Sequence, residues 1–339
     1  MSLLSSEKLR HFHDKKLLLA FSGGADSTAL FFTLVQHNIP FDIAIVHYGL
    51  RVQADEEVAY AQALAKEHAL HCHLLKAARI EQNFEYEARH VRYGFFEQLI
   101  QEHDYTHLLT AHHLQDRLEW MLMQLCKGAG LAELVGMQES ETRADYTLCR
   151  PLIECSRDEI ISFLKTQEIQ WFHDESNDDP SYKRNYFRHE IATKLIQKYD
   201  TGIKQSFKYL EEDVKELIKD VQVHEAQEMS LFICTGHKRS DIFHIDKILK
   251  SKGYILTAQQ REELKDHDEI IAGRKFLVVL HRGIYYIAPY LTDIMDKGFK
   301  EECRELGVPV KLRPYLFSNP LAFILFTRFL PCNINMHGK

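Results

Sequence analysis

The chain has 339 residues, of which 45% are hydrophobic and 27% charged, and its net charge is −7 at pH 7. These values are typical of a globular protein with room for two domains, and the acidic balance argues mildly against general nucleic-acid binding. The seven cysteines contain no Cys-x-x-Cys pair, which excludes a zinc ribbon or a thioredoxin-like redox pair and favours a reduced, cytoplasmic protein.

The first 170 residues alternate between strand-like and helix-like patterns. Apolar runs predict strands at 17–21, 41–47, 69–75 and 106–111, and helical spacing predicts helices at 26–36, 55–68, 83–102 and 113–126. Such alternation predicts an α/β domain with a parallel, Rossmann-like sheet and helices on both faces. Ligands of such sheets bind beyond the carboxyl ends of the strands, and the motifs described below follow such ends.

The pattern changes after about residue 215. Residues 255–265 have helical spacing, and residues 275–289 read as a hairpin that turns at Arg282 and Gly283. We therefore expect a catalytic domain at 1–215 and a smaller α+β C-terminal domain at 216–339. The apolar segment 315–330 contains Asn319, Pro320 and Arg328 and falls short of the ~20 apolar residues of a spanning helix, so we expect a buried or interface segment and no membrane contact.

The stretch SGGADS follows the first predicted strand and opens the first predicted helix. Two glycines let the backbone adopt positive φ and approach a ligand closely, and the amides of a helix N-terminus bind anions. An alternative is a plain strand-to-helix turn with Ser or Asp as the cap. The stretch is neither a Walker A loop nor a nucleophile elbow. It predicts a phosphate site made by Ser22, Gly23, Gly24, Ala25, Asp26 and Ser27.

Two further motifs follow in the chain. Residues 44–51 end the second strand with His47, for which a structural role is the simpler interpretation. Arg89 and Arg92 are three apart and share one face of a predicted helix. Such arginines are usually solvated, but beside a phosphate loop they would neutralise triphosphate or RNA charge.

Residues 110–119 end the fourth strand and begin a helix. His112 and Asp116 are four apart on one face, with Glu119 three residues further on. Such groups suit divalent metal binding and proton transfer. An acidic first helical turn is the alternative, and it explains Asp116 but not two histidines at a strand end.

Residues 174–188 join an acidic loop, DESN, to the basic aromatic stretch KRNYFR. Residues 181–208 carry seven basic and two acidic side chains, although the chain as a whole is acidic. A solvated loop and a charged helix would explain this spacing equally well. The segregation of the two signs nevertheless favours a local anionic partner.

Taken in order, SGGADS, HYGLR, EARHVRY, TAHHLQD with Glu119, and DESN followed by RNYFR resemble the tRNA(Ile)-lysidine synthase family over about residues 15–200. This family belongs to the pyrophosphate-loop ATP pyrophosphatases, with an adenine nucleotide alpha hydrolase-like fold. The resemblance implies that ATP activates the C2 carbonyl oxygen of cytidine 34 in the CAU anticodon of tRNA(Ile). The ε-amine of L-lysine then attacks C2 and displaces AMP, which gives lysidine.

The resemblance also assigns roles to residues. It places ATP on Ser22, Gly23, Gly24, Ala25, Asp26 and Ser27. It implies catalytic roles for Asp26, Arg89, His112 and Asp116, with Mg²⁺ on Asp26 and Asp116. Lysine or tRNA binding falls to Arg92, Glu119, Arg184, Asn185 and Arg188. The C-terminal domain would help to hold the tRNA, and the enzyme would be cytoplasmic and could be a homodimer.

The chain departs from the family pattern at two positions. Gln115 stands where the family commonly has the first aspartate of HHxDD, and Tyr48 stands where a histidine commonly precedes the glycine before Leu-Arg. Both changes fall near the expected metal site and leave Asp116 with fewer neighbouring ligands.

Three alternatives remain at this point. A tRNA thiolase of the same loop class would normally need cysteines placed for sulfur transfer or an iron–sulfur cluster. A small-molecule synthetase, such as a GMP or NAD synthetase, would use ATP without tRNA. A nucleotide-binding module without catalysis would bind ATP and transfer nothing.

Overall fold

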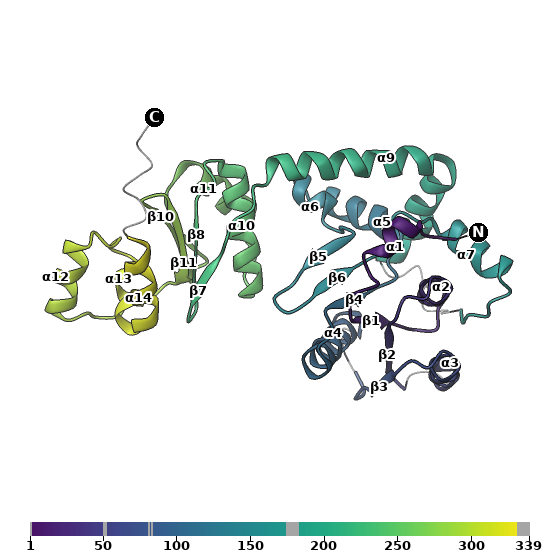
Figure 1. Ribbon diagram of the computed structural model, residues 1–339. Helices are drawn as coiled ribbons and strands as arrows, with labels where there is room; N and C mark the ends of the chain where they lie inside the picture. The colour runs from purple at the N-terminus through teal and green to yellow at the C-terminus, as the bar shows by residue number, and fades with distance from the viewer. Residues whose placement is uncertain (1, 50–52, 81, 83, 174–182, 331–339) are drawn as a thin grey trace. The chain divides into compact units, whose positions relative to one another are not determined.

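The computed structural model describes residues 2–49, 53–80, 82, 84–173 and 183–330 (Figure 1). The chain divides into two compact units, Met1–Glu211 and Glu212–Lys339.

The first unit is built around a six-stranded sheet. Its strands are β1 (Leu17–Ala20), β2 (Asp42–His47), β3 (Cys72–Lys76), β4 (His107–Leu109), β5 (Ser140–Thr142) and β6 (Thr147–Cys149). Its helices are α1 (Ser6–Arg10), α2 (Ala25–Gln36), α3 (Gln53–Glu67), α4 (Phe84–His103), α5 (Leu114–Leu125), α6 (Leu131–Val135), α7 (Arg157–Thr166), α8 (Lys183–Tyr186), the π-helix η2 (Phe187–Ala192) and α9 (Thr193–Leu217), whose end lies in the second unit.

The strand order is β3-β2-β1-β4-β6-β5, and every neighbouring pair is parallel except β5 with β6. The order reverses between β1 and β4, which pair directly with Leu18 opposite Leu108. A crevice forms at such a reversal beyond the carboxyl ends of the two strands. The loops after β1 and β4 are therefore brought together, and these loops carry SGGADS and the His-His pair.

The alternation of side chains along the strands builds a core on each face of the sheet. Leu17 and Leu19 of β1 face the core that contains residues of α2, α3 and α7. Leu18 faces the opposite core, which contains Phe96 and Leu99 of α4. Strands buried on both faces are continuously apolar, which is why β1 reads as an unbroken apolar run.

A smaller cluster fixes the helix that follows β4. Leu114 and Leu118 of α5 pack against Ala192, Ile196 and Phe207 of η2 and α9. This packing holds α5 against η2 and α9, which overlap the basic segment 181–208.

The predicted strand at 69–75 begins later than expected. Ala69 has a φ of 55°, and the backbone N–H of Leu70 bonds the carbonyl of Ala65 at 2.8 Å. This left-handed residue ends α3, so residues 69–71 form the helix cap and the lead-in to β3. Apolar content alone did not separate the cap from the strand.

The second unit contains a five-stranded antiparallel sheet in the order β7-β8-β11-β10-β9. Its strands are β7 (His224–Ala226), β8 (Met229–Ile233), β9 (Glu269–Ala272), β10 (Phe276–His281) and β11 (Ile284–Pro289). Its helices are α10 (Lys238–Ser251), α11 (Ala258–Asp266), α12 (Lys297–Glu305), α13 (Arg313–Ser318) and α14 (Pro320–Phe329). One core lies between the sheet and α10 with α11, and a second core contains residues of α12, α13 and α14.

The fold-class prediction is confirmed: a parallel α/β domain is followed by a smaller domain with helices and an antiparallel sheet. The predicted hairpin turns at Arg282 and Gly283, both with positive φ. The apolar segment 315–330 forms α13 and α14, which bury Tyr315, Leu316 and Phe326. Within the described ranges, no helix is long and apolar enough to cross a membrane.

Candidate active site

The loop after β1 forms a turn that leaves helix amides available. Gly23 adopts a φ of 75°, a conformation that favours glycine. Gly24 is the N-cap of α2 and has no side chain with which to bond the first-turn amides. Those amides and the positive end of the helix dipole suit an anion. The alternative of a Ser or Asp cap at this turn is therefore wrong.

Hydroxyl groups hold the loop closed from within. The hydroxyl of Ser27 donates to the carbonyl of Gly24 at 3.1 Å, while its oxygen accepts the backbone N–H of Ser22 at 3.2 Å. Thr28 donates to the carbonyl of Gly23 at 3.2 Å. Ser27 and Thr28 are buried, whereas Ser22 is exposed. Ser27 therefore braces the loop, and the loop offers its backbone and Ser22 to a ligand.

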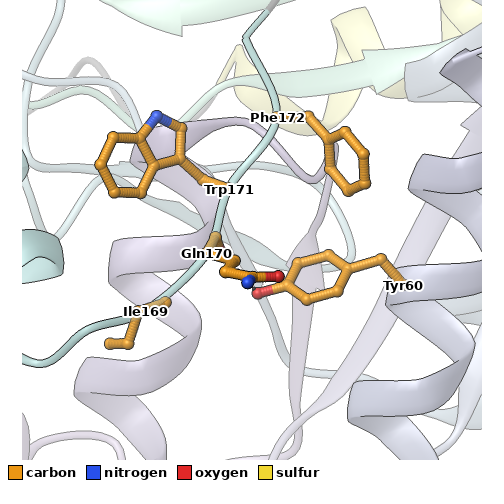
Figure 2. Close-up of a pocket in the computed structure, with 5 residues that line it drawn as sticks. All are labelled: Tyr60, Ile169, Gln170, Trp171 and Phe172. Carbon is orange, nitrogen blue, oxygen red and sulfur yellow. Dashed lines mark hydrogen bonds between the residues drawn. The ribbon is translucent and has the colours of Figure 1, made fainter.

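Residues 169–172 line the other side of this loop. The backbone N–H of Phe172 donates to the carbonyl of Gly23 at 3.0 Å. Beside this contact lies a pocket of about 350 Å³, where the hydroxyl of Tyr60 donates to the carbonyl of Gln170 at 2.7 Å (Figure 2). The pocket is lined by Tyr60, Ile169, Gln170, Trp171 and Phe172, so it contains none of the predicted site residues.

The first turn of α5 brings carboxylates to the same crevice. His113 is the N-cap, and its backbone N–H donates to Oδ2 of Asp116 at 2.9 Å in a capping box. Nε2 of His113 lies 3.5 Å from Oδ2 of Asp116 and 3.7 Å from Oδ2 of Asp26. The buried imidazole of His113 thus joins the pyrophosphate loop to α5. Asp116 serves both as part of the helix cap and as a member of the site.

Two arginines from the basic segment close on the carboxylates of α5. Nε of Arg184 bonds Glu119 at 2.5 Å, and its Nη2 lies 3.5 Å from Asp116. Nε of Arg188 bonds Glu119 at 2.9 Å, and its Nη2 also bonds Asp116. Between them in the sequence, Asn185 is buried. The structure therefore brings together the two motifs that the sequence placed about 70 residues apart.

The backbone around Arg188 is a π-helix, η2. Such wide turns are rare and are often found at functional sites. Charge-assisted pairs of an arginine with two carboxylates are strong and directional. The wide turn thus carries Arg188, one of the two arginines that bond the carboxylates of α5.

Burial and charge act in opposite directions on these groups. Burial alone would raise the pKa of Asp116, but the charges of His113, Arg188, His112 and Arg184 outweigh it and hold that pKa far below its usual range. Burial dominates at Glu119 and raises its pKa despite both arginines. Asp116 therefore keeps its negative charge, whereas Glu119 is the stronger base of the two.

His112 lies partly buried beside this cluster. Its Nδ1 lies 2.9 Å from the hydroxyl of Thr110. Desolvation lowers the pKa of His112 to about 3, against the opposing effect of Asp116 and with a further lowering by nearby arginines that include Arg89. The ring is therefore neutral at physiological pH and offers a lone pair or an N–H, not a charge.

The two arginines of α4 are less closely engaged. Arg89 is exposed and lies over the ring of Tyr93 at 4.7 Å. Its charge reaches His112, while the charge of Arg92 acts on Tyr48, whose hydroxyl donates to the carbonyl of Ala88 at 2.9 Å. Arg89 therefore acts electrostatically on His112 of the predicted catalytic pair. The predicted acidic motif at 174–177 lies outside the described residues.

Sequence reasoning missed Arg157 and did not single out His113, whose Nε2 lies within 3.7 Å of both Asp26 and Asp116. Nη1 of Arg157 donates to both carboxylate oxygens of Asp26 at 2.8 Å. A signal was available, because Ser156 and Glu159 form a capping box that marks a helix start. The order of the two histidines relative to the helix start likewise favours His113 as the cap.

Comparison with known proteins identifies the family. A family model described as a PP-loop domain matches residues 3–195. A tRNA(Ile)-lysidine synthase of Helicobacter pylori is 44% identical over 313 residues, which cover 91% of this chain and 91% of the relative. The chain belongs to the tRNA(Ile)-lysidine synthase family. A tRNA(Ile)-lysidine synthase of Campylobacter jejuni is 42% identical over 306 residues, covering 90% of this chain and 94% of the relative.

Membership of the tRNA(Ile)-lysidine synthase family makes the chain an ATP-using ligase of tRNA modification, and the three alternatives are not favoured. The U34-tRNA thiolase NcsA from Methanococcus maripaludis aligns with a TM-score of 0.51 at 18% identity, over 63% of this chain and 79% of that one. That likeness shows a shared fold only. In the described part of the chain, no three His, Cys, Asp or Glu residues group as they would around a metal or cluster.

Proposed function

We propose that this chain uses ATP to ligate L-lysine to C2 of cytidine 34 in the CAU anticodon of tRNA(Ile), with release of AMP and pyrophosphate. The observation that supports this most is a continuous cluster of polar contacts. His113 joins Asp26 of the loop at 22–27 to Asp116, and Arg184 and Arg188 bond Asp116 and Glu119. Membership of the tRNA(Ile)-lysidine synthase family supports the same reaction.

In the first step the C2 oxygen of the cytidine attacks the α-phosphorus of ATP. An O–P bond forms, the bond between the α-phosphorus and the bridging oxygen breaks, and pyrophosphate leaves. The amides of Gly24 to Ser27 would hold the leaving pyrophosphate at the N-terminus of α2. Arg89, exposed on α4, would add positive charge where negative charge develops on the phosphate.

In the second step the ε-amine of lysine attacks C2. A C–N bond forms, the bond from C2 to the AMP oxygen breaks, and the ammonium must lose its protons. Asp116 is a poor acceptor because its pKa is strongly lowered. Glu119, whose pKa is raised, is the better candidate for the proton acceptor. Asp116 would instead hold the arginines and the lysine ammonium by its charge.

Mg²⁺ could be held by the carboxylates of this site, of which Asp26 and Asp116 would contribute unequally. Mg²⁺ at ATP sites is usually held by one or two carboxylates together with phosphate oxygens and water. Both carboxylates bond arginines, Asp26 with Arg157 and Asp116 with two others, but the side chain of Asp26 is 28% exposed and that of Asp116 only 8%. Asp26 would therefore be the principal ligand and Asp116 at most a distant one. When bound, the ion would neutralise charge on the phosphates.

The residues beside the site arginines also indicate how the site would contact tRNA and lysine. Tyr186 is 53% exposed beside the site arginines, as suits stacking with an unpaired base of an RNA loop. With Asn185 and Arg92, this region would contact lysine or the anticodon. Residues 1–215 would then carry catalysis, and residues 216–339 would hold the tRNA. A cytoplasmic location and a homodimer are further parts of the proposal.

The test is whether the release of AMP from ATP depends on the presence of L-lysine and tRNA. Purified protein with ATP and Mg²⁺ should release AMP only when both L-lysine and CAU-anticodon tRNA are present at saturating concentration. AMP release with a small-molecule acceptor and no tRNA would support a small-molecule synthetase. Binding of ATP without any cleavage under all conditions would support a non-catalytic module.

A further inference from the structure

Arg157 is the first residue of α7 and reaches across to the pyrophosphate loop. A single guanidinium nitrogen, Nη1, donates to both carboxylate oxygens of Asp26 at 2.8 Å. Asp26 is the second residue of α2 and stands directly after the loop amides. The side chain of Arg157 remains 40% exposed, so this contact lies at the wall of the crevice and not in the core.

The backbone of Arg157 is held from the opposite side by Gln115. Oε1 of Gln115 accepts the backbone N–H of Arg157 at 3.0 Å. Gln115 is 2% exposed, and the capping box of Ser156 and Glu159 fixes the adjoining turn. The first N–H groups of a helix have no partner within the helix, so this bond satisfies a group that would otherwise be buried unpaired.

A neutral acceptor suits this position better than a carboxylate would. Asp26 and Asp116 already contribute two negative charges around His113. An ionised group at position 115 would add a third negative charge at a buried place, which is costly. The amide of Gln115 supplies the oxygen without the charge.

The negative charge of Asp26 opposes anion binding at the loop, and Arg157 compensates that charge. A carboxylate at the N-terminus of α2 repels an anion bound to the same amides, by Coulomb's law. A guanidinium bonded to both oxygens cancels most of that repulsion and fixes the orientation of the carboxylate. We propose that Arg157 is a positioning residue that neutralises and orients Asp26 at the ATP site, and that Gln115 anchors Arg157 there. This inference rests on ATP binding at the loop, which is part of the proposed function.

The test is a double-mutant cycle on ATP affinity, measured by equilibrium dialysis of the whole protein without tRNA, lysine or Mg²⁺. We expect Arg157→Ala to raise the Kd for ATP about tenfold, which equals about 1.4 kcal/mol. In the Asp26→Asn background the same change should alter the Kd less than about twofold, because the charge to be neutralised is gone. Arg157→Lys should recover part of the affinity.

Gln115 is tested in the same assay. Gln115→Met keeps the length and removes the acceptor, so it should raise the Kd about threefold in the wild-type background and not in Asp26→Asn. Equal losses for Arg157→Ala in both backgrounds would overturn the proposal, because Arg157 would then contact phosphate by itself. An unchanged Kd in Arg157→Ala would overturn it too. A chain that binds ATP but forms no lysidine would refute the proposed reaction and leave this cycle readable.

Discussion

At the scale of single residues, Gly23 decides the shape of the loop. Its φ of 75° is strained for any residue with a Cβ, at a cost of about 1–3 kcal/mol. We expect Gly23→Ala to lower the free energy of unfolding by about this amount and to raise the Kd for ATP about tenfold or more, because the loop amides shift. Urea titration and equilibrium dialysis measure the two effects.

The matched control is Gly24→Ala. Gly24 has a φ of −72°, which any residue adopts, and a Cβ there would meet only the hydroxyl of Ser22, at 3.4 Å. We expect a stability change below about 1 kcal/mol, in the range of ordinary substitutions. Equal losses at the two glycines would show that the left-handed turn at Gly23 is not what the loop requires.

His112 gives the first unit a pH dependence. Its folded pKa of about 3 lies below the ordinary value near 6.5, so below pH 6.5 the unfolded chain binds a proton that the folded chain does not. Stability therefore falls as pH falls. Lowering the pH from 7 to 5 should cost about 1–2 kcal/mol through this residue. In His112→Asn that part of the pH dependence should be missing.

Tryptophan fluorescence measures this effect directly, because Trp120 and Trp171 both lie in the first unit. Wild type and His112→Asn are unfolded with urea at pH 7 and pH 5. Parallel changes in the two proteins would contradict the account of His112 as a histidine kept neutral by desolvation.

The sequence predicted the site at this scale only in part. The loop at 22–27 and the carboxylates Asp116 and Glu119 were candidates from residue type and spacing, whereas Arg184 and Arg188 came from the resemblance to the family. These groups meet in the structure. The contacts of His113 and Arg157 depend on how side chains leave a helix start and on where α7 passes. Neither set of contacts can be predicted from the spacing of residues along one chain.

At the scale of elements, α5 and α9 are joined by a buried ion pair. The guanidinium of Arg117 is 3% exposed, bonds Glu211 and stacks on the ring of Phe207 at 4.1 Å. Removing the acid leaves a buried cation, whereas removing the base leaves an acid that is 26% exposed and can be hydrated. We expect Glu211→Gln to lower the free energy of unfolding by about 2–4 kcal/mol and Arg117→Met by less. Urea unfolding that ranks them in the opposite order would contradict this.

In the proposed mechanism, the reaction depends on the pairing of α5 with η2. Arg188→Ala leaves the two buried carboxylates, Asp116 and Glu119, with Arg184 as their remaining arginine partner among those described. We expect tRNA-dependent turnover to fall about 100-fold, within the range for lost electrostatic stabilisation, while the Kd for ATP changes less than about threefold. Lys194→Ala is the control, because Lys194 is 63% exposed and pairs only with Glu190 in the described contacts. A selective loss of ATP affinity in Arg188→Ala would contradict the assignment.

Element positions were largely predictable because apolar runs and helical spacing reflect burial. The exceptions have local causes. Ala69 adopts a left-handed cap that delays β3, and η2 interrupts the helical backbone at Arg188. Tyr199 has non-helical angles within α9. No residue pattern signals these irregularities, because they arise from packing against neighbouring elements.

At the scale of the whole molecule, the strand order explains why distant motifs converge. The reversal between β1 and β4 is a topological fact that the alternation of strands and helices implies only in outline. The relatives match over nine-tenths of the chain, so the second unit belongs to the same family architecture.

The most direct test of the central claim is the transfer of labelled lysine to RNA. The protein is incubated with ATP, Mg²⁺, labelled L-lysine and two tRNAs that differ only in the base at position 34. We predict stable label in the tRNA that carries cytidine 34 and none in the tRNA with another base there. Equal labelling of both tRNAs, or none in either while ATP still binds, would contradict the account.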